Sequence, residues 1–165
     1  MKNNIIFLDV DGVLNSHLYI ENYKGSREEW IKLSERERNL DPKAVKMLDQ
    51  LCKDTNSKIV LSSTWRLGDE GKLLKEFLSE LNFKSEIIDC TGRCCSGIRG
   101  VEIYNWWKDN KDKYNEYAII DDDNDMMLYQ QYNFFKIDGY VGLTPTICWK
   151  IERLLNGRRE ESMVL

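Results

Sequence analysis

The sequence has no excess of positive charge and no long apolar stretch. Its 24 Lys and Arg residues are outnumbered by 28 Asp and Glu residues, which gives a formal net charge of -4. Because proteins that neutralise many nucleic-acid phosphates are usually basic, we expect no broad duplex-binding surface. No apolar run approaches the roughly 20 residues of a membrane-spanning helix. Asp9 interrupts the segment 1–8 too early for an export signal, so we expect a cytoplasmic protein.

Histidine is nearly absent, and the cysteines are odd in number. The chain has five cysteines and a single histidine, His17, which fits reduced thiols in the cytosol. Cys90, Cys94 and Cys95 lie close together and raise zinc binding as an alternative. Their spacing is not CxxC, no second cluster follows, and His17 is distant in the sequence. Loop or core cysteines are the preferred interpretation.

Apolar runs alternate with amphipathic segments along most of the chain. Runs rich in β-forming residues predict strands over 5–10, 58–61, 86–89, 117–120 and 134–137. Helical periodicity predicts helices over 70–81, 100–112 and 125–132, and Asp-Pro at 41–42 and Thr-Pro at 144–145 mark the starts of two more. Strands that are apolar throughout and alternate with helices are typical of a parallel sheet covered on both faces.

The sequence therefore predicts an α/β fold in three layers, a Rossmann-like parallel sheet with helices on both faces. No internal repeat or low-complexity linker divides the chain, so we expect a single domain over residues 1–156. The polar and aromatic segment 15–39 is expected to form a flap. The charged end of the chain, 157–165, is expected to be a loose tail.

Polar side chains follow three of the predicted strands. Asp9 and Asp11 end the first, Ser62 follows the second, and Asp121 and Asp122 end the strand at 117–120. Since ligands bind beyond the carboxyl ends of parallel strands, we expect these groups to meet at one edge. Carboxylates crowded there raise one another's pKa, and Mg²⁺ suits such an all-oxygen set. Carboxylates with Mg²⁺ are typical of phosphoryl transfer.

Each motif alone also has a simpler interpretation. Paired aspartates after a strand are common in turns, and Asp123 or Asp125 can cap a following helix. Serines fill many loops. The conjunction of all three motifs at strand ends, in this order, favours a functional site.

The segment 7–14, with Asp9, Asp11 and Gly12, resembles the first motif of the haloacid dehalogenase (HAD) superfamily. Ser62 resembles its second motif, a hydroxyl residue that closes a strand. The pair Asp121-Asp122 resembles the fourth motif, which is acidic.

The third motif of the superfamily is a single basic residue at the start of the helix before the acidic strand. Arg99 stands in that place, and Lys108 and Lys111 are alternatives farther along the same helix. The resemblance spans roughly residues 3–155 and so covers nearly the whole chain.

The resemblance implies the roles of the catalytic residues. It implies that Asp9 attacks phosphorus to form an aspartyl-phosphate, while Asp11 protonates the leaving oxygen and then activates water. Ser62 and Arg99 would bind the phosphoryl oxygens. Asp11 also favours a phosphatase, because dehalogenases of the superfamily lack an acid at that position. One departure is Val13, where many family phosphatases carry threonine.

The resemblance also implies a Mg²⁺ site. Its ligands would be Asp9, the backbone carbonyl of Asp11, and Asp122 with Asp121 close by. The spacing leaves both Asp121 and Asp122 as candidate direct ligands.

The chain lacks room for a large cap domain, since 15–39 and 66–99 hold only a flap, one helix and a short strand. It is therefore similar to capless members with an open site, and to HAD domains associated with nucleic-acid repair. The expected partner is a phosphorylated substrate, either a nucleotide, a nucleic-acid end or a small phosphomonoester. A phosphoprotein substrate, a phosphoacceptor signalling domain and a non-catalytic module are the alternatives.

Four residues are candidates for substrate contacts. Ser63 and Arg66 are expected to bind substrate, and Trp65 and Arg93 are candidates to stack on a base or hold a sugar-phosphate. Core packing for Trp65 and surface ion pairs for the arginines are the alternatives.

Overall fold

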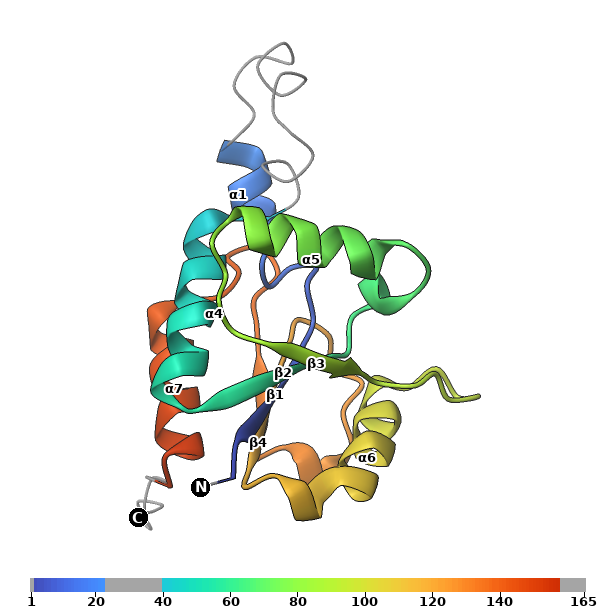
Figure 1. Ribbon diagram of the computed structural model, residues 1–165. Helices are drawn as coiled ribbons and strands as arrows, with labels where there is room; N and C mark the ends of the chain where they lie inside the picture. The colour runs from blue at the N-terminus through green and yellow to red at the C-terminus, as the bar shows by residue number, and fades with distance from the viewer. Residues whose placement is uncertain (1, 23–39, 158–165) are drawn as a thin grey trace, which may run out of the picture.

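A parallel sheet lies at the centre of the computed structural model, which describes residues 2–22 and 40–157 (Figure 1). The strands are β1 (Asn4–Leu8), β2 (Ser57–Leu61), β3 (Ile87–Cys90), β4 (Tyr117–Asp121) and β5 (Phe134–Lys136). They lie in the order β3-β2-β1-β4-β5, and every neighbouring pair is parallel. The predicted α/β fold class is confirmed, and each predicted strand is found with bounds within two residues.

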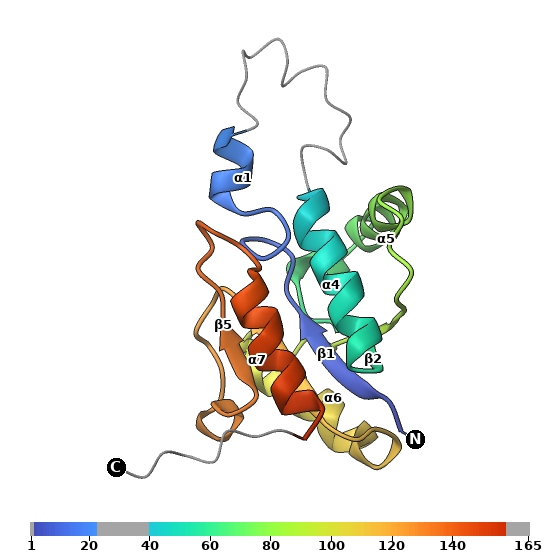
Figure 2. The same cartoon turned by 90° about the vertical axis from the view of Figure 1, so that its left-hand side faces the viewer.

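Helices cover the two faces of the sheet unequally. The helices are α4 (Pro42–Asp54), α5 (Glu70–Glu80) and α7 (Pro145–Leu155) on one face, and α6 (Arg99–Asn110) on the other. Figure 2 shows α4 and α7 side by side along the sheet. This arrangement confirms the predicted three layers.

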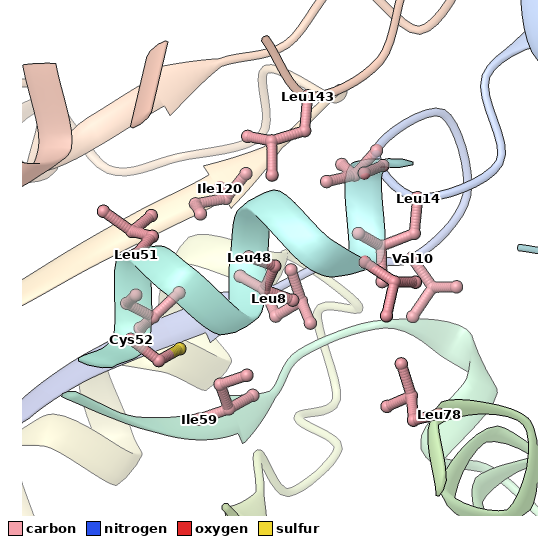
Figure 3. Packing of buried hydrophobic residues seen from close by; sticks show 14 of the residues in the cluster. Leu8, Val10, Leu14, Leu48, Leu51, Cys52, Ile59, Leu78, Ile120 and Leu143 are labelled. Atoms are coloured by element: carbon pink, nitrogen blue, oxygen red, sulfur yellow. The ribbon is translucent and has the colours of Figure 1, made fainter. Parts of the chain in front are cut away.

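The alternation of strand side chains produces two separate cores. Leu8 and Ile59 pack in the larger core beneath Leu48 of α4 (Figure 3). Their strand neighbours Phe7 and Val60 pack in the smaller core, together with α6. Successive residues of a strand point to opposite faces, so strands that are apolar throughout supply both cores.

The two predicted helix starts are confirmed by their caps. The Asp41 carboxylate accepts a hydrogen bond from the backbone N–H of Lys43 (2.8 Å), and α4 begins at Pro42. The Thr144 hydroxyl accepts one from the backbone N–H of Ile147 (3.3 Å) at the start of α7. Both caps satisfy backbone donors that the first helical turn leaves without a partner.

The predicted helix over 125–132 is wrong, because only a single 3₁₀ turn, η3 (Leu128–Gln130), forms there. The Asp125 carboxylate accepts a hydrogen bond from the backbone N–H of Arg99 (2.8 Å), and its backbone carbonyl accepts one from Gly100 (3.1 Å). Asp125 therefore caps α6 instead of starting a helix of its own.

The remaining differences concern segment ends. The predicted helix over 100–112 divides into α6 and a 3₁₀ turn, η2 (Lys111–Lys113). The described part of the predicted flap contains helix α1 (His17–Asn22), while 23–39 and the tail beyond 157 lie outside the described residues. Among the described residues, no helix has both the length and the apolar character needed to cross a membrane.

Candidate active site

Strand register brings three polar side chains to one level at the edge of the sheet. Leu8 of the central strand β1 pairs with Leu61 of β2 and with Ile120 of β4. The following residues are Asp9, Ser62 and Asp121. Two backbone hydrogen bonds of 2.9 Å continue the pairing to this level, from Ser62 N–H to the Leu8 carbonyl and from Asp9 N–H to the Ile120 carbonyl.

Three carboxylates gather at this edge. Asp9, Asp121 and Asp122 each offer an oxygen, and these atoms all lie within 4.8 Å of one another. Burial, reinforced by the charge of Asp9, raises the pKa of Asp121 to about 7. Burial also raises the pKa of Asp9 and that of Asp122 above the ordinary value of 3.8. In the absence of a cation, the cluster therefore resists full ionisation.

Arg99 is the basic residue that faces the cluster. Its Nη1 atom lies 2.6 Å from Oδ1 of Asp9 and 3.3 Å from Oδ2 of Asp121. Burial opposes the charge of Arg99, but Asp121 and Asp9 outweigh that effect and raise its pKa. The other two basic candidates, Lys108 and Lys111, are exposed farther along the chain.

Two buried oxygen atoms at the site have no hydrogen-bond partner among the described residues. They are Oγ of Ser62 and Oδ2 of Asp121, the latter in contact with Arg99 but without hydrogen-bond geometry. A buried polar atom without a partner is costly, so such atoms are expected to meet a ligand. The all-oxygen donor set around Asp121 fits Mg²⁺, and the Ser62 hydroxyl can donate to a phosphoryl oxygen.

The described residues give no support to the zinc alternative. Within them, the carboxylate cluster is the one group of three or more His, Cys, Asp or Glu side chains placed to hold a metal ion. Cys90 and Cys95 are exposed thiols, and Sγ of Cys94 lies 3.0 Å from the Ser96 hydroxyl.

Two glycines let Asp122 approach the cluster. A Cβ atom at Gly12 would lie 2.2 Å from Oδ2 of Asp122, and one at Gly139 would lie 2.6 Å from it. Gly12 also has a φ of +70°, which other residues rarely adopt. The glycine of the first motif therefore provides both the turn after β1 and the space for Asp122.

Lys136 is a site residue that the sequence interpretation missed. It ends β5, pairs with Asp121 in register, and donates a hydrogen bond to the backbone carbonyl of Asp122. Its charge opposes the effect of burial on the pKa of Asp122. The predicted strand over 134–137 placed Lys136 inside the strand, so the rule that polar groups follow strand ends did not identify it, whereas β5 ends at Lys136.

Asp11 lies apart from the carboxylate cluster, and polar neighbours hold its side chain. The indole Nε1–H of Trp65 lies 3.0 Å from each carboxylate oxygen of Asp11. The Asn15 amide donates a further hydrogen bond to Oδ1 (2.8 Å), and its own oxygen accepts one from the backbone N–H of Gly12 (2.9 Å). The described contacts give the Asp11 carboxylate no place among the metal-binding oxygens.

The two predicted substrate contacts, Ser63 and Arg66, are engaged with the protein itself. Ser63 is fully buried, and its hydroxyl accepts a hydrogen bond from Trp65 N–H (3.3 Å). Arg66 donates to the backbone carbonyls of Ser62, Ser63 and Thr91, and forms a 2.6 Å ion pair with Glu102. These contacts favour a structural role for Arg66 over the predicted substrate contact. Arg93 is exposed.

Comparison with known families agrees with this geometry. The model of a family described as the HAD domain in Swiss Army Knife RNA repair proteins matches residues 5–147. The chain belongs to this family. No curated protein and no solved structure matches the chain.

Membership of this family confirms the predicted HAD superfamily and the predicted association with nucleic-acid repair, which the family description specifies as RNA repair. It also supports a phosphatase-like function, and HAD domains generally use Mg²⁺. The residues that resemble the four motifs lie together at one edge of the sheet in this HAD domain. They are Asp9, Ser62, Arg99 and Asp121.

Proposed function

We propose that this HAD domain is a Mg²⁺-dependent phosphomonoester hydrolase with Asp9 as its nucleophile. One observation supports the proposal most directly. The buried Asp9 carboxylate lies 2.6 Å from the Arg99 guanidinium, and Ser62, whose buried hydroxyl has no partner among the described residues, follows the neighbouring strand at the same level. A phosphoryl group placed there would meet a nucleophile, a fixed cation and a hydroxyl donor together.

The first step transfers the phosphoryl group to the protein. A carboxylate oxygen of Asp9 attacks phosphorus, and the bond between phosphorus and the ester oxygen breaks. Asp11, in its protonated form, gives its proton to the departing oxygen, so that an alcohol leaves and an aspartyl-phosphate remains. Arg99 and Ser62 donate hydrogen bonds to the non-bridging oxygens as charge builds on them.

The second step returns Asp9 to its starting state. Water attacks the phosphorus of the aspartyl-phosphate, and the Asp11 carboxylate takes a proton from that water. The acyl-phosphate bond breaks, inorganic phosphate leaves, and Asp11 is again protonated. One residue thus acts as acid and then as base.

The carboxylate cluster is where Mg²⁺ would bind. Asp9, Asp121, Asp122 and the backbone carbonyl of Asp11 would hold it, and its charge would offset that of the carboxylates and of the phosphoryl oxygens. The orphaned Oδ2 of Asp121 supports this assignment.

We further propose that the substrate is a phosphate at the end of an RNA chain. The family description, which names RNA repair proteins, supports this class. A net charge of -4 argues against a broad surface that binds the phosphates of a duplex, and so favours recognition of the end of an RNA chain. A free nucleotide, another small phosphomonoester and a phosphoprotein are the competing substrates.

The first test is hydrolysis of p-nitrophenyl phosphate with and without Mg²⁺. We expect turnover that needs Mg²⁺ and that Asp9→Asn and Asp11→Asn abolish, while circular dichroism shows both variants folded. Full activity in Asp9→Asn would refute the mechanism. Stable phosphorylation of the protein without turnover would instead indicate a phosphoacceptor domain.

A substrate panel then tests the proposed class. Nucleotides, phosphopeptides and 3′- or 5′-phosphorylated RNA and DNA oligonucleotides are compared by kcat/KM at fixed ionic strength. The highest kcat/KM is expected for a phosphorylated RNA end. Preference for free nucleotides or phosphopeptides would overturn the RNA assignment and leave the hydrolase mechanism intact.

A further inference from the structure

Trp65 touches the proposed acid–base residue directly. Its indole Nε1–H lies 3.0 Å from Oδ1 and 3.0 Å from Oδ2 of Asp11, across 54 residues of sequence. Asp11 is exposed, so solvent would otherwise supply most of its hydrogen bonds. An indole N–H is a donor only, and it therefore fixes the orientation of a carboxylate without competing for the proton that the carboxyl group transfers.

The protein fixes Trp65 in turn. The residue lies in the 3₁₀ turn η1 (Thr64–Arg66), which the Ser63 hydroxyl caps through the backbone N–H of Trp65. The ring is partly buried against the larger core. Arg66 stabilises the turn, because its guanidinium donates hydrogen bonds to the backbone carbonyls of Ser62 and Ser63 and to the carboxylate of Glu102.

The same turn therefore serves two parts of the site. Ser62, with its unpartnered hydroxyl, lies just before the turn at the level of Asp9, while Trp65, three residues later, reaches Asp11. The base-stacking role considered for Trp65 from sequence is not needed to explain its position, since its polar atom is directed at Asp11.

We propose that Trp65 is a positioning residue that holds the Asp11 carboxyl group in place to protonate the leaving oxygen. The inference rests on the proposed function. In the step concerned, the phosphorus–oxygen ester bond breaks, phosphorus bonds to Asp9, and the proton of Asp11 moves to the ester oxygen. Misplacement of a catalytic group by about 1 Å can cost roughly 100-fold in rate, so loss of the indole contact has a measurable effect.

A matched pair of esters isolates this role. Phenyl phosphate and p-nitrophenyl phosphate have similar shapes, but p-nitrophenolate is a stable anion near neutral pH and can leave without a proton. Phenol resembles the tyrosine side chain, with a pKa of about 10, and depends much more on an acid. The quantity compared is kcat/KM, which covers the steps up to departure of the alcohol and excludes hydrolysis of the aspartyl-phosphate.

The variant is Trp65→Phe, which keeps an aromatic ring and removes the N–H donor. We expect kcat/KM to fall roughly 10- to 100-fold for phenyl phosphate, whose leaving group needs a proton, and only several-fold for p-nitrophenyl phosphate. Trp149→Phe is the control, since Trp149 is an exposed residue on α7 that stacks with Arg153. It should hydrolyse both esters as the unmodified protein does.

The outcomes separate the inference from the function on which it rests. Equal losses for both esters in Trp65→Phe, or no loss for either, would overturn the positioning role while the hydrolase mechanism stands. If the unmodified protein hydrolyses neither ester with Mg²⁺, the proposed function fails and the inference falls with it.

The contact itself has a readout that needs no activity. The indole N–H signal of Trp65 in a ¹⁵N-labelled sample is the one that Trp65→Phe removes. Replacement of the carboxylate in Asp11→Asn should move this signal to higher field, because a charged acceptor makes the stronger hydrogen bond. An unmoved signal would show that the indole does not bond to Asp11 in solution, and would overturn the proposal.

Discussion

Arg99 is the shared cation of two buried carboxylates, and its removal should affect both activity and stability. In Arg99→Met, Asp9 and Asp121 would lose the guanidinium that lies 2.6 Å and 3.3 Å from them. We expect kcat/KM for p-nitrophenyl phosphate to fall by roughly 10²–10³, as it does when a donor to a developing charge is removed. Thermal melting without Mg²⁺ should also occur at a lower temperature.

The control for this prediction comes from the same helix. Lys108→Met removes an exposed charge from α6 and should leave both kcat/KM and the melting temperature close to those of the unmodified protein. Activity in Arg99→Met that matches the Lys108→Met control would show that Arg99 does not stabilise the transferred phosphoryl group.

Gly12 should be needed for Mg²⁺ binding as well as for the turn after β1. The Cβ of Gly12→Ala would lie 2.2 Å from Oδ2 of Asp122 and would force that carboxylate out of the cluster. We therefore expect a much smaller rise in melting temperature on addition of Mg²⁺, measured by calorimetry. Gly68→Ala is a matched control, since Gly68 has the same φ of +70° but nothing within 4 Å of an added Cβ.

The comparison of these two glycine variants separates backbone strain from crowding. Both should lower the melting temperature of the metal-free protein, because alanine is strained at positive φ. Only Gly12→Ala should also weaken the response to Mg²⁺. If both variants respond to Mg²⁺ as the unmodified protein does, Asp122 is not a metal ligand.

At the scale of elements, one buried ion pair connects the turn after β2 with helix α6. Arg66 and Glu102 lie 2.6 Å apart, and their side chains are only 6% and 4% exposed. Glu102 also accepts a hydrogen bond from the backbone N–H of Cys94 (3.1 Å), so the pair joins the loop before α6 as well. The elements that present Ser62 and Arg99 are thereby held together.

Removal of one partner of this pair should be strongly destabilising. Arg66→Met would leave Glu102 buried without its cation, and we expect the free energy of unfolding in urea to fall by about 3–5 kcal/mol. The exposed pair of Lys72 and Asp69, 3.2 Å apart, supplies the control. Lys72→Met should change stability little, because exposed pairs contribute little. Equal effects of the two substitutions would contradict a structural role for Arg66.

The elements also show which features the sequence could predict. The positions of Asp9 and Asp121 follow from local signals, because each comes at the end of an apolar run, rich in β-forming residues, that predicts a buried strand. Arg66 offered no such signal, since its partner Glu102 lies 36 residues away and no spacing relates the two. The same holds for Asp125, whose acidic run predicted a helix start but whose side chain caps α6, 26 residues earlier.

At the scale of the whole molecule, folding places a cluster of acidic groups at the end of the central strands, and stability should depend on pH as a result. Without metal, burial raises the pKa of Asp121 from 3.8 to about 7. Between these values the folded protein holds a proton that the unfolded chain releases. The stabilising contribution is therefore complete below about pH 4 and is lost as the pH rises through 7. The pKa of Asp49 is lowered from 3.8 to about 2, because hydrogen bonds from Lys53 and Ser85 outweigh the effect of burial. Asp49 therefore makes stability rise with pH, but only at pH values below those over which Asp121 acts.

Mg²⁺ should cancel this loss, because it binds the ionised carboxylates in the folded protein and has no such site in the unfolded chain. We expect the melting temperature in a chelator to fall between pH 5 and pH 8, and the gain on addition of Mg²⁺ to be larger at pH 8 than at pH 5. In Asp121→Asn, both the melting temperature in a chelator and the gain on addition of Mg²⁺ should depend less on pH, because the amide does not titrate. Asp123→Asn, an exposed neighbour outside the cluster, should retain both. A gain from Mg²⁺ that is the same at both pH values in the unmodified protein would show that metal binding does not displace the proton of Asp121.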